Sequence, residues 1–360
     1  MASVEWGKYR IDDLFKIQTS AKRFDANKVN IIENGRYPYV VRTSSNNGQK
    51  GFLDENECFL NAENTISFGQ DTATIFYQEK PYFTGDKIKV LVPKVYKFNK
   101  KNAQFFLASM NIAFSKFSWG SSRFNVDVLK EQVIMLPTKC DSIDFEFMES
   151  FIEELEAERI EELEAYLSVS GLKDTQLTAD ELSALDKFNS IKWKKFNLET
   201  LFGKSTRGKR LKGDDRIGGN LPFVTAGETD EGISAFISND VEIFSSNTTT
   251  IDMFGSAKYR NYNYGADDHI AVVHTENLSK YAAIFVTSAC HKSAHNGDFS
   301  YSRNFYAKDA DKLYISLPVK NEQPDYELMS TLISAIQKLV IADVVKFSDE
   351  KIKATKQVVG

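Results

Sequence analysis

The chain has 360 residues, of which 42% are hydrophobic and 26% are charged, and its net charge at pH 7 is −5. This length favours about two globular domains, and the composition lets each of them bury its own core. The sequence shows no secretory pattern at its start and no run of the roughly 18 apolar residues that a membrane helix requires, so we expect no membrane span.

Residues 1–140 are predicted to form a first globular domain, mainly of β character. Short β-type runs recur along it, and Gly-, Asn- and Ser-rich turn signals separate them. The runs are YPYVV, ENTISFG, ATIFYQ, KIKVLV and EQVIMLP. One helix is expected in the stretch NAQFFLASMNIAFSKF. The sequence therefore predicts an α+β domain.

Residues 141–190 are predicted to form a long helix followed by a connector. Apolar side chains recur at about helical spacing in Met148, Ile152, Leu155 and Leu163. Between Asp144 and Glu164 this segment carries ten acidic residues and one basic residue, which leaves a charge of +4 on the rest of the chain. The acidic total therefore does not exclude a nucleic-acid partner. In the connector, Thr178 and Glu181 fit a capping box that starts a short second helix.

Residues 191–320 are predicted to repeat the first domain, and residues 321–360 to repeat its helix. IAVVHT and KLYISLP have the pattern of strands, and LSKYAAIFVTSACHK has that of a helix. In the last segment Met329, Leu332, Ile336 and Leu339 belong to an apolar stripe. We expect the two long helices to pair antiparallel through these stripes. The alternative is that each helix packs only on its own domain.

The two halves match in order along the chain. WGKYRIDDLF at Trp6 corresponds to WKKFNLETLF at Trp193, a shift of 187 residues. Later matches fall at smaller shifts, between 186 and 180, as a few loop deletions would produce. They are Pro38 with Pro222, Gly69 with Gly255, Arg123 with Arg303, and Asp144 with Asp325. A period of this length indicates a duplicated domain. Two similar but unequal units suit a target with two similar but unequal halves.

The sequence motifs that suggest catalysis each lack a required residue. The chain has no Pro-Pro pair, which the usual motif of amino-group methyltransferases contains, and the GKS at 203–205 has Leu198 where a phosphate loop needs glycine. Cys290, His291 and His295 lie in a predicted helix and its end, without a second ligand pair, so we expect no metal. The three cysteines, Cys58, Cys140 and Cys290, form no CxxC pair and suit a reducing cytoplasm.

One enzymatic alternative stays open, a duplicated metal-dependent nuclease with one degenerate copy. Asp86 and Lys87 precede a predicted strand, and Asp267 and Asp268 correspond to them in the second half. The second half has His269 where the first has Lys87. An Asp at a turn before a strand is also common for hydrogen-bonding reasons alone.

Predicted loops in both halves combine cations with short polar side chains, as DNA-binding surfaces do. Lysine and arginine neutralise phosphates, while Arg, Asn, Gln and Ser can also contact base edges. In the first half the candidates are Lys22, Arg23, Arg42, Ser45, Asn46, Asn47, Gln49, Lys50, Ser121, Ser122 and Arg123. In the second half they are Arg207, Lys209, Arg210, Lys212, Lys258, Arg260, Ser302, Arg303 and Asn304. The alternative for any single loop is an ordinary solvated turn.

The loop at 42–50 differs most between the halves, because its counterpart at 225–230 is much less basic. We expect the matched cations to hold the DNA backbone and the divergent loops to read bases.

The ordered motifs resemble those of DNA-specificity subunits of Type I restriction–modification systems, or of the similar Type IIB subunits. The motifs are the W-xx-[YF]-x4-LF opening of each half, the closing stretches GSSRFNVDVLKEQVIMLP and SYSRNFYAKDADKLYISLP, and the helix after each. The resemblance covers essentially the whole chain. It implies two target-recognition domains, each reading one half of a split site in double-stranded DNA, with antiparallel spacer helices between them.

The resemblance also implies partners and a role in defence against foreign DNA. Modification subunits would dock on the helices, bind S-adenosylmethionine and methylate adenine, so the chain itself needs neither an active site nor a cofactor. The presence of a restriction subunit is left open. A duplicated protein- or glycan-binding module is a third class, which binding to duplex DNA would disfavour.

Overall fold

The structure is a computed structural model that describes residues 4–115 and 126–359, without the side chains of 355–359. It divides into two compact units, unit 1 at Met1–Glu162 and unit 2 at Leu163–Gly360. The domain boundaries at 140, 190 and 320 stay predictions from the sequence. The helix α4 (Phe145–Val169) begins in unit 1 and ends in unit 2.

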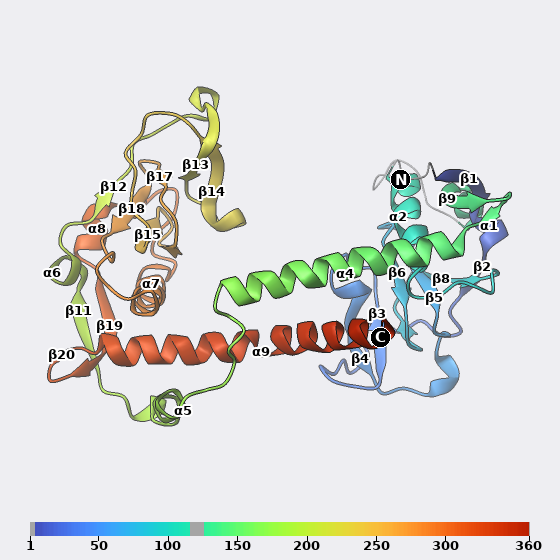
Figure 1. Cartoon of the computed structure of the whole chain (residues 1–360), viewed down its shortest axis with the longest axis horizontal. Coiled ribbons are helices and arrows are strands. Elements are labelled where there is room, and N and C mark those ends of the chain that lie inside the picture. The colour runs from blue at the N-terminus through green and yellow to red at the C-terminus, as the bar shows by residue number, and fades with distance from the viewer. Residues whose placement is uncertain (1–3, 116–125, 360) are drawn as a thin grey trace. The chain divides into compact units, whose positions relative to one another are not determined.

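The described strands of unit 1 form three sheets (Figure 1). The first sheet has the order β1-β9-β10, with β1 (Glu5–Arg10), β9 (Val133–Lys139) and β10 (Ser142–Ile143). The second has the order β2-β8-β5-β6, with β2 (Phe15–Thr19), β8 (Ile88–Pro93), β5 (Thr65–Gly69) and β6 (Ile75–Gln78). The third has the order β4-β3-β7, with β4 (Gln49–Leu53), β3 (Tyr37–Val40) and β7 (Phe83–Thr84).

Four helical segments of unit 1 contribute to the core that also contains the second sheet. They are α1 (Ile11–Leu14), α2 (Ala103–Phe114), α3 (Val126–Glu131) and the start of α4. The largest core cluster joins side chains of α2, such as Phe106 and Met110, to Ile66, Phe68 and Leu91 of the sheet. The predicted strands are therefore confirmed, as is the predicted helix over Ala103–Phe114, and the domain is α+β of mainly β character.

Unit 2 repeats this topology strand for strand. Its sheets have the orders β11-β19-β20, β12-β18-β15-β16 and β14-β13-β17. The strands are β11 (Trp193–Asn197), β12 (Thr206–Arg207), β13 (Gly218–Val224), β14 (Ile233–Ile237), β15 (Thr248–Asp252), β16 (Ala257–Arg260), β17 (Gly265–Ala266), β18 (Ile270–Val273), β19 (Tyr314–Lys320) and β20 (Gln323–Pro324). The helices are α5 (Ala179–Asp186), α6 (Leu198–Phe202), α7 (Lys280–Ala294), α8 (Ala307–Asp311) and α9 (Tyr326–Val359). The duplication predicted from the sequence is therefore present in the fold.

The structural register corrects one of the sequence matches. Thr65 pairs with Gln78 in unit 1 as Thr248 pairs with Arg260 in unit 2, so β5 and β15 correspond residue by residue. Gly69 then corresponds to Asp252, and the match of Gly69 with Gly255 is wrong. The tight turn simply lies at a different offset from the strand in the two units.

Both long helices start in the same way. The Oδ1 atoms of Asp144 and Asp325 each accept a hydrogen bond from a backbone N–H three residues later, at 3.0 Å. Each Asp follows a short hairpin whose turn has two residues of positive φ, at 140–141 and at 321–322. These caps satisfy N–H groups that a helix start leaves free.

The first turn of each long helix packs on its own unit. Met148 belongs to the core of unit 1 and Met329 to that of unit 2, and both are fully buried. Both were predicted to pair the two helices, and for these two residues the prediction is wrong because the preceding hairpin directs the first turn onto the sheet. Ile336 and Leu339 are about half exposed. For these two, and for Ile152, Leu155 and Leu163, pairing stays a prediction.

Within unit 2 the last turns of α4 contact α9. Glu164 Oε2 accepts a hydrogen bond from Ser348 Oγ at 3.5 Å, and Leu167 and Ser348 are buried. Lys173 lies between Glu164 and Asp349 and pairs with both carboxylates. The end of the first long helix is therefore attached to the second.

Helix α9 is long and apolar enough to cross a membrane by length and hydropathy alone, over Tyr326–Ala354. Polar and charged residues interrupt the apolar side chains of this helix, so the sequence shows no continuous apolar run there. In unit 2 this helix packs against α7 and α5 (Figure 1), and Met329, Leu332 and Ala335 are buried there. Protein contacts therefore account for part of its apolar surface.

The predicted capping box at Thr178 is confirmed and also fixes α5 to α9. Thr178 Oγ1 accepts from Glu181 N at 3.2 Å, and Glu181 Oε2 accepts from Thr178 N at 2.7 Å. Glu181 further accepts from Ser334 Oγ at 2.6 Å and from Lys338 Nζ at 3.1 Å. The hydrogen bond from Ser334, above all, lowers the pKa of Glu181 to about 2.

Glu181→Gln is expected to destabilise the chain by about 1–3 kcal/mol at pH 7, since hydrogen bonds to charged groups are worth this much. The depressed pKa means that the contribution is fully present above about pH 4.5 and is lost as the pH falls towards 2. Thermal unfolding at pH 7 and at pH 3 measures both effects. Asp180→Asn, an exposed change on the same helix, is the control. If Glu181→Gln and the parent chain melted at the same temperature at pH 7, the hydrogen bonds of Glu181 would not stabilise the fold as we expect.

Candidate nucleic-acid interface

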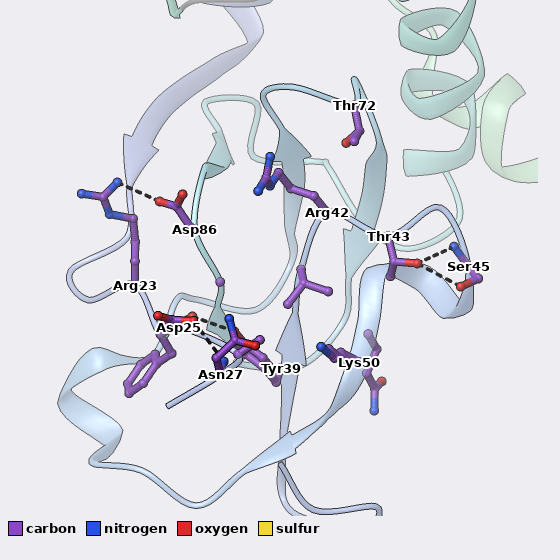
Figure 2. A pocket seen from close by; sticks show the side chains of 15 residues that line it. Arg23, Asp25, Asn27, Tyr39, Arg42, Thr43, Ser45, Lys50, Thr72 and Asp86 are labelled. Atoms are coloured by element: carbon purple, nitrogen blue, oxygen red, sulfur yellow. Dashed lines mark hydrogen bonds and ion pairs between the residues drawn. The ribbon is translucent and has the colours of Figure 1, made fainter. Parts of the chain in front are cut away.

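A cavity of about 1060 Å³ opens on unit 1 between segments that are far apart in the sequence. Figure 2 shows Arg23 and Asp86 on one side, Arg42 and Thr72 on another, and Lys50 below. Five predicted DNA-binding residues line it, namely Arg23, Arg42, Ser45, Gln49 and Lys50. The structure therefore brings together two of the three loops predicted in the first half. The third loop, with Ser121, Ser122 and Arg123, lies outside the described residues.

Carboxylates hold the two arginines of this cavity in place. Arg23 Nη1 lies 3.2 Å from Asp86 Oδ1, and Arg42 Nη1 lies 2.5 Å from Asp71 Oδ2. Lys87 Nζ shares Asp71 at 2.7 Å. Such partly exposed ion pairs are weak, so a phosphate can replace a carboxylate at little cost.

Lys22 and Lys50 are arranged differently from the arginines. Lys22 Nζ lies 4.5 Å and 4.7 Å from the ring centres of Phe24 and Phe59, and 3.9 Å from Glu55. Lys50 is exposed and has no carboxylate within 4.0 Å among residues 4–115 and 126–354. Its ammonium group is therefore available to an anion.

The floor of the cavity comes from residues that the sequence did not single out. Tyr39 Oη donates to Phe24 O at 2.6 Å, which ties β3 to the segment 23–27. Burial raises the pKa of Tyr39 to about 12, so the hydroxyl keeps its proton. Asp25 and Asn27 also line the cavity. The sequence shows only the strand YPYV here, because nothing local indicates what the strand will face.

A short loop of left-handed residues stands beside β3 in unit 1 and beside β13 in unit 2, and we call it the tip loop. In unit 1 it comprises Asn46, Asn47 and Gly48, with φ of 49°, 52° and 75°. In unit 2 it comprises Asp230, Glu231 and Gly232, with φ of 49°, 55° and 79°.

The surroundings of the two tip loops repeat as well. Each glycine carbonyl accepts a hydrogen bond at 2.8 Å, from Val41 N in unit 1 and from Thr225 N in unit 2. Each neighbouring strand pair also carries a register shift at the same place, after Tyr39 and after Phe223. The backbone frame is thus the same in both units, while the side chains on it change from amides to carboxylates.

The predicted readers Asn46 and Asn47 partly serve the tip loop itself. Asn46 Nδ2 donates to Gln49 O at 3.2 Å, and Asn47 Nδ2 donates to Tyr77 O at 3.0 Å. Asparagine tolerates positive φ better than most residues, which suits it to this position. Both side chains remain exposed.

In unit 2 an exposed basic segment follows β12. Arg207, Lys209, Arg210 and Lys212 are exposed, and none has a carboxylate within 4.0 Å in the described part of the chain. The segment crosses β17 at Gly208, where a Cβ atom would lie 1.7 Å from Ala266 O, so only glycine fits. These four predicted residues therefore form one cationic surface.

The other predicted residues of unit 2 have partners inside the protein. Ser302 Oγ lies 2.8 Å from Ser300 Oγ, and Asn304 Nδ2 donates to Tyr306 Oη at 3.3 Å. Arg303 is exposed and lies 5.3 Å from the ring centre of Phe299. Lys258 is mostly buried and pairs with Glu228 at 3.3 Å.

Arg260 has to be removed from the DNA-contacting set. Only 2% of it is exposed, and its guanidinium donates to Thr250 Oγ1, to Glu231 O and to Tyr262 Oη at 2.8–2.9 Å. A phosphate cannot reach it without opening the fold. The sequence placed it in a basic loop, but it ends the edge strand β16 with its own side chain buried.

The tip loop of unit 2 is acidic on its exposed side. Asp230 and Glu231 are exposed, and Glu228 precedes them. A hydrogen bond from Ser256 and the charge of Lys258 lower the pKa of Glu228. Glu228 therefore adds a further negative charge beside the acidic tip loop of unit 2, whereas the tip loop of unit 1 carries no charged side chain.

The groups proposed for a nuclease do not converge in the same way in both units. In unit 1 Lys87 pairs with Asp71, while Asp86 pairs with Arg23. In unit 2 ligand atoms of Asp267, Asp268 and His269 lie within 4.8 Å of one another. However, Asp267 Oδ1 accepts a hydrogen bond from Leu211 N at 3.3 Å, and Asp268 Oδ1 lies 3.0 Å from His269 Nδ1 as an ion-pair contact, so this group differs from the lysine–carboxylate pairs of unit 1.

The Cys290 cluster is also committed to the fold. Burial raises the pKa of Cys290 to about 12, and His291 Nδ1 accepts from Ala257 N at 3.1 Å. The Cys290 thiol therefore keeps its proton, and His291 Nδ1 is occupied by a backbone hydrogen bond, so neither is a ready metal ligand.

The chain matches proteins that confer DNA specificity. The family model described as Type I restriction modification DNA specificity domain matches residues 3–165 and again 190–346. A relative described as the specificity subunit of a Type II restriction enzyme, S.BcgI from Heyndrickxia coagulans, is 25% identical over 346 residues, or 94% of this chain and 96% of that protein.

A solved structure shares the fold. It is the S subunit of a Type I restriction–modification system from M. genitalium, with a TM-score of 0.62 and 17% identity, covering 99% of this chain and 95% of that one.

Proposed function

The chain belongs to the family of Type I restriction–modification DNA specificity domains, of which it contains two copies, and from this membership we propose how its units share the reading of DNA. As a member it supplies DNA sequence specificity to a restriction–modification complex and is not itself an enzyme. The alternative of a duplicated nuclease is not supported.

We propose that unit 1 and unit 2 each read one half of a split target. The observation that carries this proposal is the tip loop, whose backbone is the same in both units while its side chains differ in charge. Amide groups can both donate to and accept from base edges, whereas carboxylates only accept, for example from the amino group of cytosine. Two related domains can thus select different base pairs.

Cations in the same unit as each tip loop would supply most of the affinity. In unit 1 these are Arg23, Arg42 and Lys50, and in unit 2 the segment 207–212. Contacts to phosphate position a protein on the duplex without specifying sequence. The acidic tip loop of unit 2 would be repelled by phosphates, so a basic segment in the same unit is needed to bring it to the groove.

The partners that we propose are modification subunits which bind S-adenosylmethionine and methylate adenine, and a restriction subunit where the system cleaves DNA. Exposed apolar side chains on the long helices offer a docking surface, among them Phe151 and Leu155 on α4 and Ile336 and Leu339 on α9. We place the protein in the cytoplasm, where DNA and S-adenosylmethionine are available.

Methylome sequencing tests this function. A strain that expresses the chain with its methyltransferase should carry methylated adenines in one split motif, and a strain without the chain should not. The purified chain alone should leave plasmid DNA intact with magnesium or manganese. Cleavage of the plasmid would indicate a nuclease instead. The absence of any methylated split motif would contradict the proposal.

Replacing Lys209, Arg210 and Lys212 by alanine should weaken DNA binding and its salt dependence. Each lost phosphate contact lowers the slope of log affinity against log salt by about 0.9, so the slope should fall by about 2–3. Fluorescence anisotropy at 50–200 mM salt measures it.

Alanine at three other exposed lysines of unit 2 is the matched control, namely Lys195, Lys292 and Lys312. An equal loss of slope in the control would mean that the chain responds only to its total charge.

A further inference from the structure

A buried polar side chain lies beneath each tip loop. In unit 1 it is Gln78, which is 4% exposed, and in unit 2 it is Arg260, which is 2% exposed. Both end the edge strand of their sheet, β6 and β16, and both face a threonine in the antiparallel register. They therefore occupy the same position in the two copies, although their chemistry differs.

The two side chains make the same connection. Gln78 Nε2 donates to Asn47 O at 3.2 Å, and Arg260 Nη1 donates to Glu231 O at 2.8 Å. In both units the acceptor is the carbonyl of the middle residue of the tip loop. One buried donor in each unit thus links the tip loop to the sheet, and in unit 1 the bond from Asn47 Nδ2 to Tyr77 O adds a second link.

Each donor is itself oriented by a hydroxyl on the neighbouring strand. Gln78 Nε2 also donates to Ser67 Oγ at 3.0 Å, and Arg260 Nε donates to Thr250 Oγ1 at 2.9 Å. Both hydroxyls in turn donate to a backbone carbonyl of the edge strand at 3.3 Å, that of Phe76 in unit 1 and of Lys258 in unit 2. The same chain of hydrogen bonds, from the edge strand through a hydroxyl and the buried donor to the tip loop, is therefore present in both units with different residues.

This chain of hydrogen bonds supports a backbone conformation of the tip loop that is otherwise unfavourable. Two consecutive residues other than glycine have positive φ in each tip loop. Such residues persist only where their surroundings fix them. A bond to the central carbonyl fixes the peptide plane between the second residue and the glycine, and with it the direction of both exposed side chains.

The charge of the buried donor follows the charge of the tip loop. Neutral Gln78 supports neutral Asn46 and Asn47, whereas Arg260 supports Asp230 and Glu231. The Arg260 guanidinium has no carboxylate within 4.0 Å in the described part of the chain, and its hydrogen-bond acceptors are neutral oxygens. The buried guanidinium is therefore satisfied by neutral oxygens and not by an ion pair.

We propose that Gln78 and Arg260 are positioning residues that hold the tip loops in the geometry for base reading, each for its own half of the target. Neither touches DNA, and each acts through the carbonyl that it binds. The inference rests on the proposed function, because base reading by the tip loops is part of it.

The test compares three variants in complex with the modification subunits, Arg260→Met, Arg260→Gln and Gln78→Met. Methionine has about the length of glutamine but donates no hydrogen bond, so the comparison of Arg260→Met with Arg260→Gln isolates the donor. Glutamine makes this bond at the equivalent place in unit 1. Competition binding uses the motif found by methylome sequencing and duplexes with substitutions in either half. The measured quantity is the ratio of Kd for a substituted duplex to Kd for the full motif.

Arg260→Met should reduce discrimination at the half read by unit 2 about tenfold and leave the other half unchanged. Gln78→Met should reduce discrimination at the half read by unit 1 and leave the half read by unit 2 unchanged. Arg260→Gln should restore most of the discrimination that Arg260→Met loses. Tyr262→Phe, which removes another acceptor of Arg260 but leaves the carbonyl bond, should resemble the parent chain.

Two outcomes would overturn the inference while the parent complex still binds its motif specifically. One is full discrimination by both methionine variants. The other is an Arg260→Gln variant as poor as Arg260→Met, since the hydrogen bond would then not matter. If Arg260→Met does not fold, as judged by thermal melting, the milder Gln78→Met decides alone. Absence of specific binding by the parent complex would instead contradict the proposed function.

Discussion

Changing Asp230 and Glu231 together to asparagine should alter one half of the methylated motif and leave the other half as it was. The substitution gives the tip loop of unit 2 the side chains found at the same positions in unit 1. Carboxylates that accept from base amino groups are replaced by amides that can also donate, so a different base edge is favoured. A good base contact contributes about 1–3 kcal/mol, so discrimination should shift by about 5- to 150-fold.

Methylome sequencing of the double variant reads this result directly. Asp240→Asn with Glu242→Gln is the matched control, because it removes the same charge from exposed positions of unit 2 outside the tip loop. The control should retain the parent motif. A changed motif in the control, or an unchanged one in the tip-loop variant, would argue against reading by this loop.

Inserting four residues after Leu155 should lengthen the unspecified gap between the half-sites without changing either half. Helix α4 starts in unit 1 and ends in unit 2, so it can set their separation. A rise of about 1.5 Å per helical residue moves one unit by roughly 5–6 Å, or between one and two base pairs. Four residues are close to one full turn, so the direction of the helix faces is nearly kept.

The gap is read from the methylome of a strain that carries the insertion. An insertion of the same length after Gly297, in an exposed turn of unit 2 with open space around it, serves as the control and should leave the gap unchanged. An unchanged gap with four residues added to α4 would mean that this helix does not act as the spacer.

The duplicated frame of this molecule is visible in its sequence because the features that build it are local. The opening motifs at Trp6 and Trp193 and the closing motifs that end at Pro137 and Pro318 are each short runs of sequence, although the fold pairs them over a long distance. Asp144, Asp325 and the capping box at Thr178 depend on residues three positions away. Patterns of this range can be recognised in a single sequence.

The functional surface is less accessible to sequence reasoning because it depends on which strands become neighbours. Arg260 looks like a phosphate contact within KYRN, yet its strand pairing with β15 buries it. Gln78 showed no signal at all, since a polar residue at the end of a strand is usually solvated. The cavity of unit 1 joins residues 23–27 to residues 39–50 and Asp86, and no short motif reports such a contact.

Each unit also closes on itself. The opening strand of its sheets pairs antiparallel with their last long strand, β1 with β9 and β11 with β19, so the chain enters and leaves the sheets of each unit side by side. Genetic recombination with breakpoints at these two strands would replace the segment from β1 to β9, or from β11 to β19, and leave the long helix that follows untouched. A population of such genes could therefore acquire new half-sites by exchanging whole segments, without waiting for point mutations to rebuild a loop.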